Sequence, residues 1–491
     1  MNSEQTPAVL TIDAGTSALK AALYSHRGQM LALAVQRYGY RTPRPGWAEA
    51  DPADWWQALV AALKKLRDQG YALASVRALG ITGQMHSPVL LDETGQVLSP
   101  AILWLDGRAA DELRTLQAQL QLPPHQLNAS FTLPKLLWLH RHRPEIITRT
   151  HTLLWPKDYL RFRLTRQRLT DLTDAAGAAL LDWKRRTWAV ERLALVGLTP
   201  DALPAIKPSH ADAGALAPEM AAHLGLSPDV RVIVGAGDVI SLLGVAPMQP
   251  GRMICTLGSS TMLATPVPHA FQEDPQHRLH LYPFLPIPIL NGIQSTSGAA
   301  LTWAWHSLHP EQASLETTVA AAMQTPPAAE GLLFLPFLAG ERNPYWNDAL
   351  RGAFFGLSLA HGRDHMMRAV MEGVALSVRH LLDIAASLRA PVAELALTGG
   401  GAAIPGWAQI FADVCQRPTA LYASESAATR VIFAFCLMAI SPQTSFDEAL
   451  AAALSSPQAH FIPQPATRDL YDRAYCRYLK LADFATQLSE L

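Results

Sequence analysis

The chain has 491 residues, of which 49% are hydrophobic and 16% are charged, and its formal net charge is −1. This length exceeds what one compact core usually holds and predicts two large domains. The balanced charge excludes the basic field that would hold nucleic acid or an anionic membrane surface, so the expected partners are small molecules.

The cysteines and the apolar runs indicate the compartment. The four cysteines are scattered without a paired C-x-x-C spacing, which argues against a zinc cluster or a disulfide framework. The first residues are polar, and no apolar run approaches the roughly 20 residues that a membrane-spanning helix needs. We therefore expect a cytoplasmic protein that binds neither nucleic acid nor membrane.

The first part of the chain predicts strands, tight turns and one long helix. Residues 9–13 form an expected strand, the small residues 14–17 a turn, and residues 31–35 a later strand. A helix is expected after Asp51, which can cap it and precedes apolar residues at helical spacing. The apolar run 76–81 is typical of a buried strand.

The same opening recurs in the second half of the chain. A strand is expected over 252–257, a turn of Gly, Ser and Thr over 258–261, and a return strand over 262–265. Further along, residues 364–382 carry a helical apolar stripe, and residues 394–397 form a strand that leads into three glycines. Two copies of one pattern predict two similarly built α/β domains.

We place the division between these domains near the turn that ends at Gly251. The predicted domains are residues 1–248 and residues 249–491. No short repeat or low-complexity segment interrupts either of them.

ATP chemistry needs backbone N–H groups around the phosphates, which glycine-rich turns can provide. The P-loop pattern G-x-x-x-x-G-K-[ST] is absent from the sequence. Two G-x-G segments occur, at 235–237 and 399–401, but Ile240 and Ile404 stand where the dinucleotide fingerprint has its third glycine. A nicotinamide enzyme is therefore disfavoured.

The first turn is the better phosphate candidate. Gly15 and Thr16 allow backbone amides and a hydroxyl to approach a polyphosphate, Lys20 follows on the return strand, and Asp13 can hold Mg²⁺. The turn Gly258-Ser259-Ser260 in the second copy would serve in the same way. An ordinary tight hairpin is the alternative explanation.

Three further places suit a sugar and its phosphorylation. Asp238 follows a strand and two glycines, where open α/β sheets place their ligands, although it could instead cap the next helix. His86 can hydrogen-bond a sugar, although a lone histidine is more often structural. Trp104, with Asp106 and Arg108, offers an apolar platform beside a fork-shaped hydrogen-bond donor, which suits a polyol. The alternative explanation for Asp106 and Arg108 is a surface ion pair.

Taken together, these segments resemble the large family of carbohydrate kinases that includes xylulose, glycerol, gluconate and ribulose kinases, and most of all its xylulose kinases. The resemblance extends over most of the chain in family order and is carried by IDAGTSALK (12–20), PGWAEADPADWW (45–56), GQMH (83–86), PAILWLDGR (100–108), LPKLLWLHRHRPEI (133–146), PKDYLR (156–161), GAGD (235–238), TLGSS (256–260), FLPFLAGERNP (334–344), RGAFFGL (351–357) and LTGGGAAIPGWAQIFADV (397–414).

The resemblance implies a fold, a reaction and roles for several residues. The fold would be two actin-like (ribonuclease H-like) α/β domains around a central ATP and sugar cleft, the first for the sugar and the second for the nucleotide. The reaction would be ATP-dependent phosphorylation of a small ketose, D-xylulose to D-xylulose 5-phosphate, with Mg²⁺. Asp238 would be the catalytic base, Met85 and His86 would contact the sugar, and Asp13 would be a catalytic carboxylate on the metal or phosphate side. Gly399, Gly400 and Gly401 would face the nucleotide.

Three features depart from the family pattern. Relatives usually carry asparagine where this chain has Leu105 and Val239, which leaves the exact sugar open. The segment 427–433 is bulkier than the usual Ala- and Gly-rich helix, which leaves the nucleotide affinity open. Homodimer formation is also left open. The alternatives are a kinase for another pentulose or polyol, an actin-like ATPase, and a degenerate kinase that binds sugar without turnover.

Overall fold

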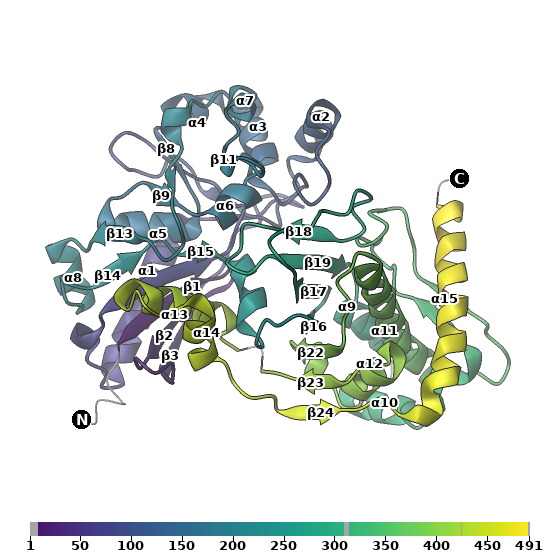
Figure 1. Ribbon diagram of the computed structural model, residues 1–491. Helices are drawn as coiled ribbons and strands as arrows, with labels where there is room; N and C mark the ends of the chain where they lie inside the picture. Colours follow the sequence, from purple (N-terminus) through teal and green to yellow (C-terminus); the bar gives the residue numbers. More distant parts are fainter. Residues whose placement is uncertain (1–7, 309–313, 424, 490–491) are drawn as a thin grey trace. The chain divides into compact units, whose positions relative to one another are not determined.

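The structure is a computed structural model that describes residues 8–308, 314–423 and 425–489. These residues form two compact units. The first consists of the described residues up to 244 together with 284–286 and 426–454, and the second of those in 245–283, 287–425 and 455–491. Each unit contains a seven-stranded mixed sheet with helices packed on it, which confirms the α/β class (Figure 1).

The sheet of the first unit has the strand order β13-β14-β5-β1-β2-β3, and β15 pairs with β5 beyond the end of β14. β1 runs antiparallel to β2 and parallel to β5. The strands are β1 (Val9–Ala14), β2 (Ala18–Tyr24), β3 (Met30–Arg37), β5 (Ala78–Gly83), β13 (Asp212–Ala215), β14 (Arg231–Ile233) and β15 (Ala236–Gly237).

Helices α1 and α5 share one hydrophobic core with the sheet of the first unit, and α13 packs on the opposite face. The described helices of this unit are α1 (Pro52–Asp68), α2 (Ala110–Leu120), α3 (Thr132–His142), α4 (Pro144–Arg149), α5 (Pro156–Thr165), α6 (Leu172–Gly177), α7 (Val190–Ala194), α8 (Pro218–Leu224), α13 (Ala427–Ile440) and α14 (Phe446–Ala453). Its short strand pairs are β4 (Glu49–Ala50) with β7 (Ala101–Ile102), β6 (Val89–Leu91) with β8 (Thr152–Leu154), β9 (Leu169–Thr170) with β12 (Ala205–Ile206), and β10 (Leu181–Asp182) with β11 (Thr187–Trp188).

The second unit repeats the central arrangement. Its strand order is β18-β19-β17-β16-β22-β23-β24, with β16 antiparallel to β17 and parallel to β22. The strands are β16 (Arg252–Leu257), β17 (Thr261–Pro266), β18 (His280–Tyr282), β19 (Ile289–Gln294), β22 (Glu394–Thr398), β23 (Thr419–Leu421) and β24 (Ala459–Phe461), with β20 (Leu333–Leu335) and β21 (Ala353–Phe355) as a separate pair. The helices are α9 (Gly298–Leu308), α10 (Leu315–Ala322), α11 (Arg363–Ser387), α12 (Trp407–Cys415) and α15 (Arg468–Leu488).

The predicted elements are confirmed, although several of their bounds differ by one to five residues. Asp51 caps α1 as expected, its carboxylate accepting a hydrogen bond from the amide of Ala53 at 2.9 Å. The strand predicted over 76–81 begins at Ala78 and continues to Gly83, because Val76 closes a 3₁₀ turn and pairing with β1 starts at Val9 opposite Ala78. The strand therefore leads directly into the GQMH segment.

One segment lies apart from the predicted division of the sequence. The first stretch of the first unit ends at Gly244, close to the predicted boundary, but α13 returns to that unit from far along the chain, as its yellow-green ribbon beside β1 and β2 shows (Figure 1). Its bulky residues explain the return. Ile432 packs so closely on Gly80 of β5 that a Cβ at that glycine would lie 2.5 Å from its Cγ2. The hydroxyls of Tyr24 and Thr429 are hydrogen-bonded at 2.8 Å.

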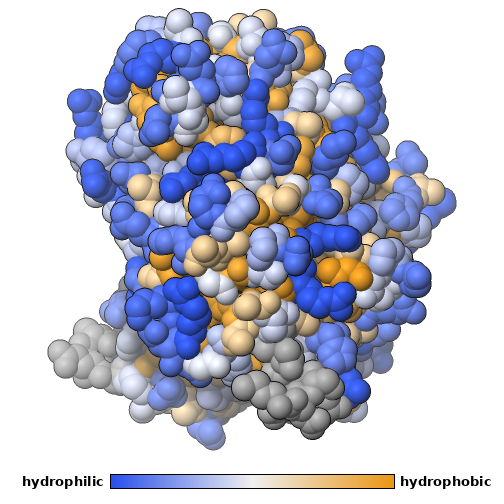
Figure 2. Space-filling view, turned by 90° about the vertical axis from the view of Figure 1, so that its left-hand side faces the viewer, coloured by the Kyte–Doolittle hydropathy of each residue, from blue (hydrophilic) through white to orange (hydrophobic). Residues whose placement is uncertain are grey.

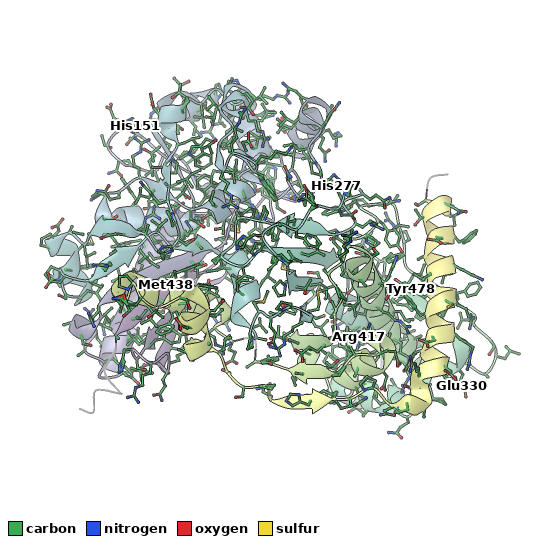
Figure 3. All side chains as sticks on the ribbon, in the orientation of Figure 1. His151, His277, Glu330, Arg417, Met438 and Tyr478 are labelled. Atoms are coloured by element: carbon green, nitrogen blue, oxygen red, sulfur yellow. The ribbon has the colours of Figure 1, made fainter. Side chains whose placement is uncertain are left out.

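Side chains fill each unit separately. Met438 on α13 lies among the side chains of the first unit, whereas Arg417 and Tyr478 lie in the second (Figure 3). On the face shown in Figure 2, hydrophilic residues predominate and hydrophobic ones are scattered between them. Among the described residues, no helix is both long enough and apolar enough to cross a membrane.

Candidate active site

In the first unit, three neighbouring strands end at one edge of the sheet, and each carries or precedes a predicted site residue. β5 is parallel to both β1 and β15, and the register places Asp13 beside Thr82 and Gly237 beside Gly83. Since the carboxyl ends of parallel strands meet at one sheet edge, Asp13, the GQMH segment and Asp238 are brought together there.

Asp13 lies half-buried at the end of β1, and its partner across the hairpin is Lys20. The Lys20 ammonium nitrogen is 3.9 Å from the Asp13 carboxylate. Burial raises the pKa of Asp13, while Lys20 lowers it by a smaller amount. The turn is closed by the Gly15 amide, which donates to the Ala18 carbonyl at 3.1 Å. A carboxylate with one weak cationic partner keeps oxygens available for another ligand.

Thr16, on the same turn, connects two other segments of the site. Its hydroxyl accepts a hydrogen bond from the Trp104 indole nitrogen at 2.9 Å and lies 3.5 Å from the side-chain oxygen of Gln84. The predicted phosphate turn is therefore joined both to the GQMH segment and to the aromatic platform.

Asp238 directly follows β15 and begins a 3₁₀ helix that extends to Gly244. The residue as a whole is half-buried. Burial, and secondly the negative charge of Asp13, raise the pKa of Asp238 to about 7. A carboxylate with a pKa near neutrality can take up a proton from an attacking hydroxyl and release it again, which is what a general base must do.

His86 is held in one orientation and one protonation state. Its φ angle is 69°, an uncommon conformation for a residue other than glycine, and its ring stacks on Phe131 at 4.7 Å between centroids. The Nδ1 atom is 2.6 Å from the Gly177 carbonyl oxygen, which can only accept, so Nδ1 carries the proton. Burial lowers the pKa of His86 to about 3. The ring is therefore neutral, and Nε2 is a hydrogen-bond acceptor.

Met85 is buried and fills the space between the GQMH segment and β15. A Cβ placed on Gly237 would lie 2.5 Å from its Cγ, and one on Gly177 would lie 2.6 Å from its Cε. Met85 is therefore an apolar spacer that sets the position of both glycine backbones.

The loop that carries Trp104, Asp106 and Arg108 has two distinct parts. Trp104 is 42% exposed, so its ring offers a free surface. Asp106 is buried, and Arg108 binds it at 2.7 Å and Glu49 at 2.8 Å while its guanidinium stacks on the ring of Trp47. The fork predicted for a polyol is thus engaged in holding the loop.

The two positions at which relatives usually carry asparagine, 105 and 239, each follow a candidate site residue directly in the sequence. Neither is a core residue. Leu105, next to Trp104, is 38% exposed. Val239, next to Asp238, is half-buried. Neither side chain is sealed beneath the sheet.

In the second unit, two glycine-containing turns meet at a corresponding edge. β16 and β22 are parallel with Thr256 beside Thr398, so the turn 258–260 and the glycines 399–401 follow the ends of neighbouring strands. Gly399 has a φ of 91°, and a Cβ there would lie 2.5 Å from the Leu257 carbonyl oxygen. At Gly400 such an atom would meet nothing within 4 Å. Its backbone is therefore open to a ligand.

A pocket of about 400 Å³ lies next to these glycines in the second unit. Its lining residues come from α9, α10 and the loop after β22 and are Trp305, Ser314, Leu315, Glu316, Gly400, Ala403, Ile404 and Pro405. Sequence reasoning missed the four contributions from Trp305 to Glu316, because no sequence pattern connects these residues with the glycines that lie far along the chain. A pocket with an apolar wall and an unobstructed stretch of backbone at Gly400 suits the binding of a flat heterocyclic ring.

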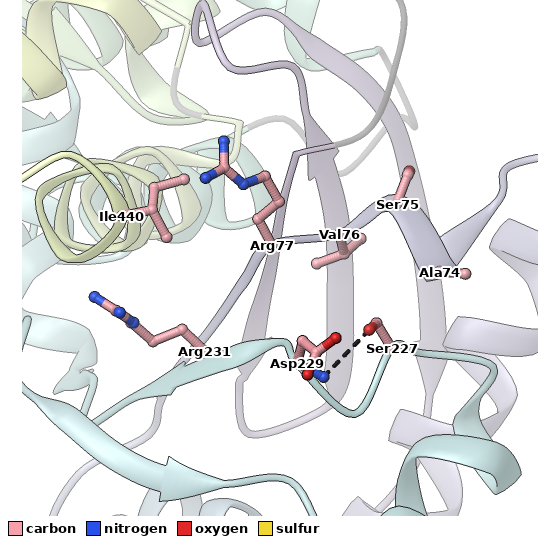
Figure 4. A pocket seen from close by; sticks show the side chains of 8 residues that line it. All are labelled: Ala74, Ser75, Val76, Arg77, Ser227, Asp229, Arg231 and Ile440. Atoms are coloured by element: carbon pink, nitrogen blue, oxygen red, sulfur yellow. Dashed lines mark hydrogen bonds between the residues drawn. The ribbon is translucent and has the colours of Figure 1, made fainter.

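The first unit has another pocket, of about 290 Å³, at the opposite edge of its sheet (Figure 4). Arg77 precedes β5 and Arg231 begins β14, so this pocket lies at the amino ends of the strands. The Arg231 guanidinium donates to the Ala439 carbonyl near the end of α13. A basic side chain there stabilises a helix C-terminus, and the pocket is separate from the candidate active site.

Comparison with known proteins gives matches over most of the chain. The FGGY family of carbohydrate kinases matches with its N-terminal domain over residues 8–244 and with its C-terminal domain over residues 253–430. A xylulose kinase of Escherichia coli (strain K12) is 37% identical over 411 residues, or 82% of this chain and 84% of that protein. One of Klebsiella pneumoniae is 35% identical over 407 residues, with the same coverage of 82% and 84%. The solved structure of a xylulose kinase from Rhodospirillum rubrum has a TM-score of 0.89 and 29% identity, and the match covers 98% of this chain and 100% of that one.

Proposed function

The chain belongs to the FGGY family of carbohydrate kinases and is an ATP-dependent sugar kinase, and from this premise we propose that it converts D-xylulose to D-xylulose 5-phosphate. The similarity to proteins named xylulose kinase supports this substrate. The observation that carries the proposal is the shared strand edge, where a carboxylate with a pKa near 7 lies with a second carboxylate and an acceptor histidine.

In the proposed reaction, a hydroxyl oxygen of the sugar attacks the γ-phosphorus of ATP. The bond from that phosphorus to the bridging oxygen of ADP breaks, and the hydroxyl proton passes to the Asp238 carboxylate. Because such transition states are loose, positioning and neutralisation of charge contribute more than the strength of the base.

The sugar side of the proposal rests on fixed groups of the first unit. The unprotonated Nε2 of His86 would accept a hydrogen bond from one sugar hydroxyl, and Met85 would define the apolar side of the binding site. The exposed Trp104 ring would support the carbon chain. Asp106 and Arg108 would act through the loop that they hold.

The nucleotide side rests mainly on the second unit. The pocket beside Gly400 would take the adenine, and the backbone of the turn Gly258–Ser260 would approach the phosphates. In the first unit, Gly15, Thr16 and Lys20 would provide the corresponding groups near the transferred phosphate.

The donor set at Asp13 fits Mg²⁺, the metal that accompanies ATP in most kinases. Asp13 offers hard carboxylate oxygens, the Lys20 ammonium is 3.9 Å away, and the neighbouring Asp238 adds to the local negative charge. Mg²⁺ prefers oxygen ligands and keeps several waters, so one protein carboxylate is sufficient. When bound, the metal would neutralise charge on the phosphates.

We also propose a cytoplasmic location for the protein. Gel filtration would test whether it forms a homodimer.

Steady-state release of ADP over a panel of pentuloses, polyols and gluconate tests the substrate. We expect D-xylulose to give the highest kcat/KM, and ATP hydrolysis without sugar to be slow. A rate of ADP release that no sugar changes would favour an actin-like ATPase. Sugar binding without ADP release would identify a degenerate kinase. A higher kcat/KM for another sugar would replace D-xylulose in the proposal.

Selectivity among ketoses should be weaker than in relatives with asparagines at positions 105 and 239. Leu105 and Val239 are partly exposed, and their apolar side chains cannot form hydrogen bonds with sugar hydroxyls. A polar side chain rejects a sugar that lacks the matching hydroxyl because it is left unpaired, and an apolar wall discriminates less between such sugars. The double variant Leu105→Asn/Val239→Asn should raise the preference for D-xylulose over a deoxy analogue about 10-fold, the value of one net hydrogen bond. The ratio of kcat/KM for the two sugars, measured in both proteins, checks this. An unchanged ratio would mean that neither side chain meets the sugar.

A further inference from the structure

The short helix α6 contacts both the base and the sugar sides of the proposed site. At its beginning, the Thr173 hydroxyl oxygen is 2.7 Å from the amide nitrogen of Gly237, the residue before Asp238. At its end, the Gly177 carbonyl accepts the Nδ1–H of His86 at 2.6 Å. One turn of buried backbone therefore adjoins the two groups that would receive the sugar and its proton.

We propose that Thr173 is a positioning residue for phosphoryl transfer, which fixes the direction of the Asp238 carboxylate by holding the amide of Gly237. This inference rests on the proposed function, in which Asp238 is the base. Thr173 does not touch the reacting atoms and acts through the Ala236–Gly237 peptide, whose N–H donates to its hydroxyl, and through the Gly237 backbone that leads to Asp238.

The direction of each hydrogen bond around Thr173 is determined. Oδ2 of Asp171 accepts from the Thr173 amide at 3.0 Å and lies 2.7 Å from the Thr173 hydroxyl. A hydroxyl has one hydrogen, so the hydroxyl of Thr173 donates it to Asp171 and presents a lone pair to the Gly237 N–H. The chain of donors runs from Gly237 to Thr173 to Asp171 without an alternative arrangement.

Asp171 is itself fixed by a buried group of charges. The Lys157 ammonium lies 3.0 Å from Asp171, 2.6 Å from Asp158 and 3.1 Å from Asp174, and all four side chains are buried. Arg161 adds a second cation, 2.7 Å from Asp158. Charges removed from water are costly to separate, so this group gives α6 a rigid anchor.

The Gly237 backbone has little freedom on its other side. A Cβ on Gly237 would lie 2.5 Å from Cγ of Met85 and 3.2 Å from the Thr173 hydroxyl oxygen. The peptide is thus held between a packed methionine and a single hydrogen-bond acceptor. Removing the acceptor leaves a buried N–H unpaired, and the peptide can regain a partner only by turning, which would move Asp238.

The matched variants are Thr173→Val, which keeps the shape and removes the hydroxyl, and Thr173→Ser, which keeps the hydroxyl. We expect Thr173→Val to lower kcat for D-xylulose about 10–100-fold, because a displacement of about 1 Å can cost 10²-fold in rate. KM for sugar and ATP should change little, and Thr173→Ser should restore most of kcat. Thr173→Ala, which places no methyl group against the amide, should lose kcat to the same extent and serves if the valine variant folds poorly.

Thr165→Val is the control for a lost buried hydroxyl. The Thr165 hydroxyl donates within α5 to the Arg161 carbonyl at 3.2 Å and accepts from the Gln167 amide at 3.4 Å, so both of its hydrogen bonds are local. This variant should lower the melting temperature without lowering kcat per folded molecule. The inference is overturned if Thr173→Val keeps kcat within about twofold, far short of that loss, if serine fails to rescue, or if Thr165→Val loses kcat equally.

Asp238→Asn, assayed in parallel, separates this inference from the proposed function. If Asp238→Asn keeps its activity, the base assignment fails whatever Thr173 does. If Asp238→Asn is inactive while Thr173→Val is fully active, only the positioning role is wrong.

Discussion

Replacing Asp238 by asparagine should lower kcat for sugar phosphorylation by about 10²–10⁴-fold, the usual contribution of a positioned general base. Asparagine has the size of aspartate but cannot take up the proton. ATP binding should be unchanged, because the pocket proposed for the adenine, beside Gly400, belongs to the other unit. Measurement of kcat together with ATP affinity by calorimetry tests both expectations.

The pH dependence of wild-type kcat/KM should agree with the same assignment. Burial and the charge of Asp13 raise the pKa of Asp238 to about 7, so the carboxyl is protonated and inactive at lower pH. The rate should therefore rise with pH through about 7 and then level off. A rate that is independent of pH between 5 and 8 would contradict the role of Asp238 as the free enzyme's base.

Folding stability provides an internal control for Asp238→Asn. A carboxyl whose pKa is raised on folding binds protons more readily in the folded state, so it costs stability as pH rises from its ordinary value of 3.8 to about 7. Asparagine removes this cost. The variant should melt at a higher temperature than the wild type above pH 7 and at a similar temperature below pH 4. Loss of activity cannot then be attributed to unfolding.

Asp229→Asn makes the same substitution at the other edge of the sheet. Asp229 is exposed and lines the pocket at the amino ends of the strands. It should leave kcat and the pH profile unchanged. If Asp238→Asn retained more than about a tenth of the wild-type kcat, well short of the loss for a general base, Asp238 would not be the base.

The sequence predicted the parts of the site that depend on local patterns. The strand–turn–strand opening was readable from a short apolar run followed by small turn residues, and it places Asp13 near the end of β1. The rule that ligands lie at the carboxyl ends of strands in open α/β sheets singled out Asp238, whereas the common edge that it shares with Asp13 and the GQMH segment came from the strand registers of the structure. The family resemblance gave the order of these segments along the chain.

What the sequence could not predict depends on partners that lie far apart in the chain. Thr173 is 64 residues from Gly237, and no periodicity connects them. For Asp106 and Arg108 an ion pair was only the alternative explanation, and the sequence did not indicate that this pair is buried or that Glu49 and Trp47 also contact the guanidinium. In the same way, the apolar residues of α13 do not indicate by themselves which sheet buries them.

Asp13→Asn should depress turnover strongly and shift the Mg²⁺ dependence to higher concentration. Loss of a carboxylate that serves the metal, directly or through water, should raise the half-saturating Mg²⁺ concentration by about 10–100-fold, as for other groups that support a bound metal. Titration of Mg²⁺ at saturating ATP and sugar, in both proteins, measures the shift. Asp229→Asn again serves as the control for a lost surface carboxylate.

The same substitution should also change the behaviour of Asp238, independently of the metal. The charge of Asp13 is the second cause of the raised pKa of Asp238, so neutralising it should lower that pKa. The rise of kcat/KM with pH should therefore begin at lower pH in Asp13→Asn, even though its maximum is reduced. A shifted Mg²⁺ titration with an unshifted pH profile would place Asp13 at the metal but too far from Asp238 to influence it. If neither changes, Asp13 is only a residue of the hairpin.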